Sequence, residues 1–448
     1  MKTHPRMLTL ATALVTLSVS LSGQSVYPTG TTRYDREKAF NSFVLFTGGD
    51  NIARLIDMNG NPVREWRNAG DLTTLIDPKL VGGKRGHVLV TLSMLNIPGT
   101  DLVPGATGRA AESIGELDWE GNTVWTFGPK APGRLAYQHH DWDRLPNGNT
   151  LVLANAVHPI KGFTQPRLLD DVIYEVNRAG DIVWTWVAGE HLEEFGFTPE
   201  QLALIRNSES ADYLHVNSMR LVGSNHWFTS GDERFRPENV IISSRNANLV
   251  AIIDKSTGNV VWTLGPNYTP NPPSDRRVPR LLDRTSGQHD PHVIPEGLPG
   301  AGNLLVFDNE GPAGYPNLPL AVTGGSRVLE IDPVRKEIVW QYSGEDSGGP
   351  GWSFRSTHIS NARRLPNGNT FIDEGQKGRL FQVTQDGEIV WEYVNPYPRR
   401  GTDPRTGRAT TNQQLYRGQP VPYEWVPAGT PYSETPVVAQ DSSRFRAQ

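Results

Sequence analysis

The chain has 448 residues, with 43 Lys and Arg against 48 Asp and Glu and a formal net charge of −5, which excludes the basic character typical of nucleic-acid-binding proteins. Hydrophobic residues make up 37% and charged residues 20%, a composition that excludes general disorder and is typical of a globular protein with a large core. The absence of cysteine excludes disulfides, thiolate metal sites and cysteine nucleophiles.

The first 23 residues are predicted to form a secretory signal peptide. Lys2 and Arg6 precede an apolar run over residues 7–21, and the small residues Ser22 and Gly23 follow it. The run is shorter than the roughly 20 residues that a membrane-spanning helix needs, although a short membrane anchor is the alternative. We therefore expect a periplasmic or secreted protein that has no membrane contact after cleavage.

A hairpin with a tryptophan at its end occurs six times along the chain. Each copy has alternating apolar residues and a turn with glycine or polar residues. The copies cover residues 53–66, 112–125, 171–184, 248–262, 326–340 and 378–391, and they end at Trp66, Trp125, Trp184, Trp262, Trp340 and Trp391. This repetition predicts a repeat fold in which the tryptophans pack between neighbouring sheets.

A second hairpin precedes most of these copies. It is clear at residues 140–155, 215–232, 289–311 and 358–375, weaker at 79–93, and reduced to one strand at 40–49. Two hairpins per repeat make a four-stranded sheet, and six such sheets predict an all-β, six-bladed β-propeller. The first repeat is one strand short, so we expect a C-terminal segment near residues 420–427 to complete the first blade. The propeller then forms one domain over residues 24–438, followed by a disordered tail at 439–448.

The predicted strand order places the tight hairpin turns on one face of the ring and the long connections on the other. These connections cover residues 127–139, 187–214, 232–246, 264–288, 309–325 and 342–357. Long loops on a rigid scaffold are where binding and catalysis usually occur. One of them contains a predicted helix over residues 198–207, capped by Thr198 with Pro199 in its first turn, which we hypothesise to be a lid over the channel.

Four histidines stand at equivalent positions, shortly before the apolar residues of four inner strands. They are His140, His215, His289 and His358, with His139 and His292 close by in the sequence. Innermost strands line the centre of a propeller, so these side chains are expected to ring the mouth of its channel. Imidazole titrates near neutral pH, which favours a functional ring over one that only satisfies backbone groups in a wet channel. Polar residues at the far ends of the next strands are expected to orient the imidazoles: Asn155, Asp232, Asp308, Asn309 and Glu374.

Several motifs of the chain resemble those of the bacterial arylsulfotransferase (aryl-sulfate sulfotransferase) family. They are HHDWDRLPNGNTLV, HVNSMRL, the QHD of QHDPH, the FDN of LLVFDNEG, SRVLEID and HISNARRLPNGNTFI. The resemblance covers most of the chain between about residues 40 and 420. It implies an exported six-bladed propeller that moves a sulfuryl group from a phenolic sulfate ester to a phenol acceptor, with no nucleotide donor and no cofactor.

The resemblance also implies roles for individual residues. The transient sulfohistidine would form on His358, with His215 and His289 as flanking imidazoles that bind the sulfuryl oxygens. A neutral imidazole is a competent nucleophile at sulfur, and cationic neighbours would stabilise the negative oxygens. Substrate binding is assigned to other polar residues of the same region: His140, His292, Asn217, Arg220, Asn309 and Arg355.

The chain departs from the family pattern at one arginine. Family members commonly carry an arginine shortly after the Asp-Asn pair of the fifth repeat, whereas here none occurs between Asn309 and Arg327. Arg220, Arg355 and Arg327 are the candidates for its role. A divergent member with another substrate, or one without transfer activity, would show the same departure.

Three other functions stay open on the sequence alone. In a metal-dependent ester hydrolase, His289, His292 and the other imidazoles would hold a divalent ion such as Zn²⁺ that activates water. A quinone-cofactor dehydrogenase is suggested by residues 251–262, although only one repeat carries that pattern well. A non-enzymatic propeller would bind partners or glycans. For the sulfotransferase, we expect a small phenolic sulfate donor, a phenol acceptor, no nucleic acid, no bound metal and a monomeric protein.

Overall fold

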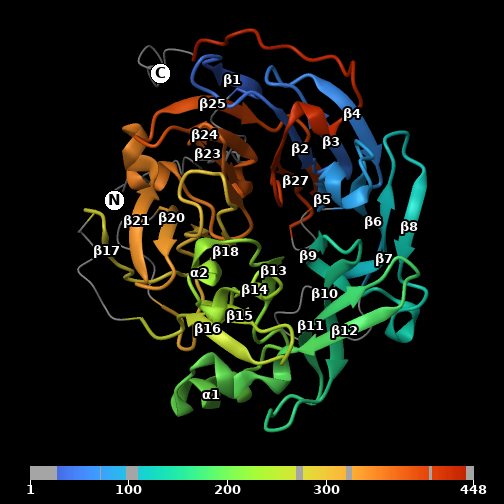
Figure 1. Cartoon of the computed structure of the whole chain (residues 1–448), viewed down its shortest axis with the longest axis vertical. Coiled ribbons are helices and arrows are strands. Elements are labelled where there is room, and N and C mark those ends of the chain that lie inside the picture. The colour runs from blue at the N-terminus through green and yellow to red at the C-terminus, as the bar shows by residue number, and fades with distance from the viewer. Residues whose placement is uncertain are drawn as a thin grey trace, which may run out of the picture.

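The computed structural model describes residues 28–70, 72–96, 109–268, 276–318, 325–402 and 406–439. The predicted signal peptide lies outside these residues, as does all but the first residue of the predicted tail. Antiparallel sheets are arranged in a ring (Figure 1), which confirms the predicted all-β propeller architecture. No helix in the described part of the chain is long and apolar enough to cross a membrane.

Three sheets of the ring follow the same strand order, from an inner strand that begins the repeat to an outer strand that ends it. One consists of β13 (Val216–Leu221), β14 (Val240–Ser244), β15 (Leu249–Ile253) and β16 (Val260–Leu264). The next has β18 (His289–Val293), β19 (Leu304–Asp308), β20 (Arg327–Asp332) and β21 (Glu337–Tyr342), with β17 (Arg280–Leu281) added at the outer edge. The third has β22 (Asn361–Arg364), β23 (Thr370–Glu374), β24 (Arg379–Val383) and β25 (Ile389–Val394), with β1 (Gly30–Tyr34) at the edge.

An eight-stranded sheet contains two repeats. The first comprises β5 (Thr73–Leu75), β6 (Val88–Asn96), β7 (Arg109–Leu117) and β8 (Thr123–Phe127). The second comprises β9 (Gln138–Arg144), β10 (Thr150–His158), β11 (Leu168–Val176) and β12 (Ile182–Val187). A single pair, Ala111 with Gln138, joins β7 to β9, so the two groups share much less pairing than the strands within each group.

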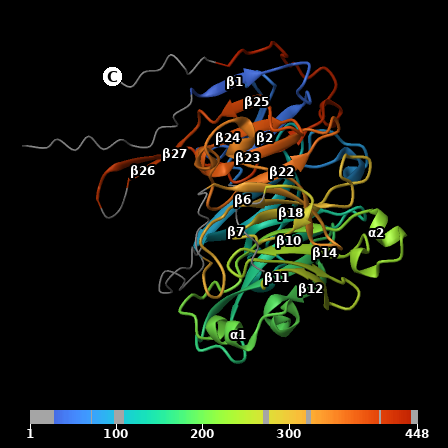
Figure 2. The ribbon, with the colours of Figure 1, turned by 90° about the vertical axis from the view of Figure 1, so that its left-hand side faces the viewer.

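The remaining sheet of the ring combines strands from near both ends of the chain. Its order is β28 (Gln419–Val421), β2 (Phe43–Thr47), β3 (Ile52–Ile56) and β4 (Pro62–Arg67). Val421 pairs with Phe43 and Gln419 with Leu45, so a strand from near the C-terminus occupies the inner position of this first repeat. Before it, β26 (Arg399–Thr402) and β27 (Ala409–Asn412) form a hairpin that projects from one face of the ring (Figure 2).

The sequence pattern of each strand follows its place in the ring. Every residue of β15 and β19 is buried, because these strands lie inside a sheet and between neighbouring sheets, and both read as apolar runs. The outer strand β21 alternates between partly buried and buried residues, as expected where one side faces solvent.

The repeated tryptophans join neighbouring sheets, as predicted. The indole N–H of Trp391, in β25, donates to the carbonyl of Met58 at 2.8 Å and so connects the last repeat to the first. Equivalent hydrogen bonds to a turn of the next repeat are made by Trp66, Trp184, Trp262 and Trp340. Trp125 is the exception, because its buried indole nitrogen has no partner among the described residues.

The expected hairpin at residues 215–232 is wrong in its second strand. The segment after β13 forms the short helix α2 (His226–Thr229), which begins because the buried Asn225 caps the amide of Phe228. The strand that pairs with β13 is β14, from a segment that was predicted to be a loop.

The predicted helix at residues 198–207 is confirmed as α1 (Pro199–Arg206). Thr198 and Gln201 form a capping box at its start. However, α1 lies at the periphery of the ring and away from its centre (Figures 1 and 2), so the hypothesis that it is a lid was wrong.

Candidate active site

The four histidines stand where inner strands begin. His140 lies in β9, His215 directly precedes β13, His289 is the first residue of β18, and His358 lies three residues before β22. The backbone is left-handed at or next to each of them, with φ of 56° at His140, 52° at His215, 53° at Asp290 and 57° at Ile359. Non-glycine residues rarely adopt this conformation, so its repetition indicates a constraint on how these side chains are aimed.

His140 and His215 come together with an aromatic residue from the C-terminal segment. The His140 ring lies 4.6 Å from the His215 ring and 5.8 Å from the Tyr416 ring, measured between centroids. His139 joins them, since its Nδ1 lies 2.6 Å from Nδ1 of His140. Burial, followed by the charges of His215 and His139, holds the pKa of His140 well below its usual value.

His215 has the opposite electrostatic environment. Burial would lower its pKa, but the carboxylate of Asp212 lies 2.5 Å from its Nδ1 and raises the pKa above the usual value. The same pairing outweighs burial at Asp212 and lowers the pKa of that carboxyl group. His215 is therefore a favourable site for positive charge in this cluster.

His358 combines accessibility with a neutral ring. Its side chain is partly buried, and Nε2 lies 3.2 Å from the amide nitrogen of Gln414, in the segment that leads to β28. Burial first, and then the positive charges of Arg245 and His215, lower the pKa of His358. A ring that stays neutral at neutral pH keeps a lone pair available for nucleophilic attack.

His289 is fixed by hydrogen bonds at both ring nitrogens. Its Nδ1 lies 2.7 Å from Oδ1 of Asn309, and its Nε2 accepts the backbone N–H of Ile359 at 3.1 Å. Burial lowers its pKa to about 3. These contacts tie β18 to the residue that follows His358, so the geometry gives His289 a positioning role, and its contact with sulfuryl oxygens stays a prediction.

A network of arginines and carboxylates lies further along the inner strands. Asp290 pairs with Arg363 and Arg220, and Arg417 pairs with Asp141 at 2.7 Å. These arginines outweigh burial and hold the pKa of Asp290 well below its usual value. His292 belongs to this network, with Nδ1 3.1 Å from a guanidinium nitrogen of Arg363.

The structure therefore separates the predicted substrate-binding residues. His140 lies in the imidazole cluster, whereas Arg220 and His292 lie in the arginine–carboxylate network. The buried Asn217 donates to the carbonyl of Gln288 at 2.8 Å.

The other predicted residues of this group belong to the loop before β22 or to its contacts. Asn309 orients His289 and also donates to the carbonyls of Ser356 and Ile359, in the loop that carries His358. The amide of Arg355 donates to Glu374 at 2.8 Å. Arg327, a candidate for the missing arginine, pairs with Asp308, Asp283 and Glu310.

Arg245 is a residue of this region that the sequence reasoning missed. It follows β14, and its backbone N–H donates to the carbonyl of His215 at 3.0 Å. Because residues 232–246 were assigned to a long connection, the position of Arg245 at the end of a strand was not recognised. The run of β-branched residues from Val240 to Ile242, followed by two serines and a turn, is the signal that would have placed it.

The family model described as Arylsulfotransferase (ASST) matches residues 55–396. The chain belongs to the arylsulfotransferase family. It is therefore a transferase enzyme, and membership implies small aryl sulfates and phenols as its substrates.

Three solved structures that resemble this chain have low sequence identity to it. A protein of unknown function from Bacteroides caccae has a TM-score of 0.47 and 13% identity, over 85% of this chain and 99% of that one. The Dos1 propeller has a TM-score of 0.36 and 10% identity, over 86% and 82%. Streptogramin B lyase has a TM-score of 0.35 and 13% identity, over 89% and 94%. No curated protein matches the chain.

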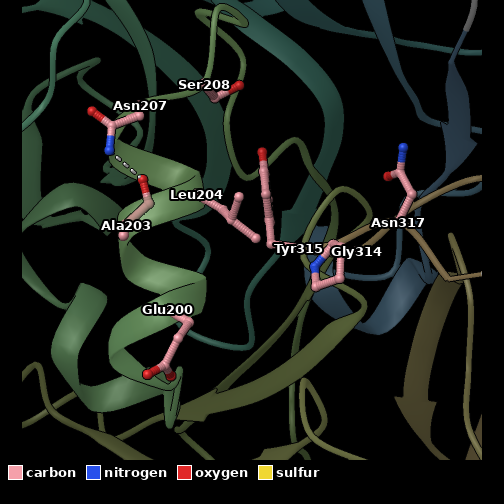
Figure 3. A pocket seen from close by; sticks show the side chains of 9 residues that line it. Glu200, Ala203, Leu204, Asn207, Ser208, Gly314, Tyr315 and Asn317 are labelled. Carbon is pink, nitrogen blue, oxygen red and sulfur yellow. Dashed lines mark hydrogen bonds between the residues drawn. The ribbon is translucent and has the colours of Figure 1, made fainter.

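The arylsulfotransferase also has a pocket of about 690 Å³ between α1 and the loop at residues 314–317. Figure 3 shows Leu204 of α1 and Tyr315 of the loop facing one another across it. The hydroxyl of Tyr315 donates to the carbonyl of Tyr213 at 2.6 Å, two residues before His215. None of the clustered histidines lines this pocket, so it is separate from the imidazole cluster.

Within the described ranges, no group of three or more His, Asp or Glu side chains is placed to hold a metal ion.

Proposed function

We propose that this protein transfers a sulfuryl group from a phenolic sulfate ester to a phenol acceptor through a covalent intermediate on His358. One observation carries the proposal: in a chain of the arylsulfotransferase family, the partly buried His358 ring has a lowered pKa and the cations Arg245 and His215 for neighbours. This environment supports a neutral nucleophile that faces an anionic substrate.

The first half-reaction begins with attack by a ring nitrogen lone pair of His358 on sulfur. As the N–S bond forms, the S–O bond to the donor breaks and its electron pair leaves on the phenolate oxygen. The cationic His215 stabilises the negative oxygens while charge moves to the leaving group.

The second half-reaction restores the enzyme. The oxygen of the acceptor phenol attacks sulfur, the S–N bond breaks, and its electron pair returns to the ring of His358. The acceptor proton passes to the departed phenolate or to solvent, so no cofactor, nucleotide or metal is needed for the balance. Donor and acceptor use one site in turn, as in other covalent transfers.

The architecture that supports this site is proposed to have six blades. The eight-stranded sheet counts as two blades because one residue pair joins its halves, and β28 completes the first blade from the C-terminal side. The N-terminal signal pattern supports a periplasmic or secreted location. We propose that the protein acts there as a monomer, on small molecules and without membrane or nucleic-acid partners.

The test uses 4-nitrophenyl sulfate with and without a phenol acceptor. The wild-type protein should release nitrophenol in an acceptor-dependent way that survives chelation, and His358→Ala should abolish the release. His226→Ala, in α2, is the matched control and should keep full activity. In the absence of acceptor, mass spectrometry should find an SO₃ adduct on the peptide that contains His358. Release that needs no acceptor and stops with a chelator would instead indicate a metal-dependent hydrolase.

A further inference from the structure

Arg245 is fixed against the segment that carries His215. Its backbone N–H donates to the carbonyl of His215, and the next amide, of Asn246, donates to the carbonyl of Leu214, both at 3.0 Å. The side chain of Asn246 adds a 2.8 Å hydrogen bond to the carbonyl of Asp212. The turn between β14 and β15 therefore holds the base of the Arg245 side chain at a defined place beside the imidazole cluster.

The guanidinium of Arg245 lacks a carboxylate partner. It is partly buried and donates to the neutral Oδ1 of Asn246 at 3.0 Å, but no carboxylate in the described part of the chain lies within ion-pair distance. The carboxylate whose charge acts on it, Asp212, is already bound to His215. A partly buried cation without a counter-charge is unfavourable, and an anionic ligand would relieve that cost.

The other arginines near the ring centre differ in this respect. Arg220 and Arg363 pair with Asp290, and Arg417 pairs with Asp141. Their charges are already compensated by carboxylates, whereas Arg245 has only the neutral oxygen of Asn246 as a side-chain partner among the described residues.

The positive charge of Arg245 also reaches the reacting side chains. After burial, it is the largest influence that lowers the pKa of His358, and His215 is the other charged group that faces this ring. It lowers the pKa of His289 as well. The charge of Arg245 is therefore felt at His358, and its backbone is hydrogen-bonded to His215 of the same cluster.

We propose that Arg245 binds the sulfuryl oxygens of the aryl sulfate ester and holds the donor against His358. This inference rests on the proposed function and assigns the cation of that site. The planar guanidinium can donate two parallel hydrogen bonds to two oxygens of one anion, which orients the group as well as attracting it. The negative ester supplies the counter-charge that Arg245 lacks in the protein.

The test measures binding without turnover. The full chain with His358→Asn is titrated with 4-nitrophenyl sulfate and, separately, with unsubstituted phenol, which is uncharged at neutral pH. Adding Arg245→Gln should weaken binding of the sulfate ester on the order of ten- to a hundredfold and leave binding of the uncharged phenol unchanged. Arg245→Lys should lie between the two, because it keeps the charge but loses the paired donors. Arg236→Gln is the matched control, since this arginine of the same repeat pairs with Glu233 and should not affect either ligand.

Thermal unfolding separates ligand binding from a structural role. Without ligand, Arg245→Gln should leave the unfolding midpoint unchanged or raise it, because the change removes an uncompensated cation. A lower midpoint together with weaker phenol binding would overturn the proposal, as would unchanged ester binding. Failure of the His358→Asn protein, with Arg245 intact, to bind the sulfate ester would also overturn the proposal. Because the His358→Asn background performs no transfer, failure of sulfuryl transfer in the wild type is a separate result that bears on the proposed function.

Discussion

Oδ2 of Asp212 lies 2.5 Å from Nδ1 of His215, and this contact sets the charge of the imidazole cluster. The pKa of His215 is raised by Asp212 in spite of burial, whereas the pKa values of His140 and His289 are lowered, chiefly by burial. A cationic and a neutral imidazole can therefore coexist a few ångströms apart. Transfer of an anionic group needs both, one to stabilise charge and one to attack.

Replacement of Asp212 by Asn should shift the alkaline limb of the pH–rate profile to lower pH. His215 is protonated below its raised pKa, so activity that needs its charge falls as pH rises through that value. Without the carboxylate, burial dominates and the fall begins at a lower pH. At neutral pH we expect kcat/KM to drop roughly ten- to a hundredfold.

The profile is measured with 4-nitrophenyl sulfate and a phenol acceptor, beside Asp181→Asn as a control. Asp181 is an exposed carboxylate paired with Lys130, and its loss should leave the profile unchanged. If Asp212→Asn reduced the rate equally at every pH, His215 would not be the group that titrates.

Asn309→Ala should impair the reaction through position rather than affinity. Asn309 holds the ring of His289 and two carbonyls of the loop that carries His358. Its loss should lower kcat about ten- to a hundredfold with little change in KM, as is typical when a residue that orients a catalytic group is removed. Asn303→Ala is the control, because Asn303 bonds to Glu330 away from the histidines. A large rise in KM with unchanged kcat would instead indicate direct contact with substrate.

The repeats made the fold predictable, because each pairs turn chemistry with a strand pattern of period two. Trp391 and its equivalents could be assigned to contacts between sheets since the same residue returns at the same place in each hairpin. The strand β14 was missed because Asn225 nucleates a short helix, a local hydrogen-bond effect that interrupts the expected hairpin.

The site was only partly predictable. The four equivalent histidines follow from the strand pattern: the His140 ring lies 4.6 Å from the His215 ring, and the charge of His215 acts on both His289 and His358. Side-chain partners do not follow from such a pattern. Asn309, directly after β19, orients an imidazole, whereas Arg220, within β13, pairs with Asp290. Arg245 follows β14, whereas His358, on which its charge acts, precedes β22. The strand pattern does not connect these two positions.

Trp391→Phe should cost more stability than Trp125→Phe. Trp391 loses a buried hydrogen bond to Met58 that connects the last repeat to the first, whereas the indole nitrogen of Trp125 has no partner among the described residues. The net worth of one such bond is about 1 kcal/mol, which is the expected difference between the two variants in free energy of unfolding. Denaturant titrations of both proteins measure it. Equal losses would mean that the indole contributes by packing alone.

Asp143→Asn should stabilise the protein at neutral pH and have no effect near pH 4. Asp143 lies in β9, beside the arginine–carboxylate network, and burial raises its pKa to about 6 against the attraction of Arg220. The unfolded chain releases this proton near the usual pKa of about 4, so between about pH 4 and 6 only the folded state keeps it. Stability therefore falls as pH rises through this window and stays lower above it, by up to about 3 kcal/mol for a shift of roughly two units.

The amide of the variant does not ionise, so this loss should disappear. Unfolding free energies from pH 4 to 8 should give two curves that meet at the acid end, separate between about pH 4 and 6 and stay apart above that window, with the variant higher. If the variant were less stable than the wild type at pH 8, the charged form of Asp143 would be a stabilising partner of Arg220. The arginine–carboxylate network would then include this ionised carboxylate.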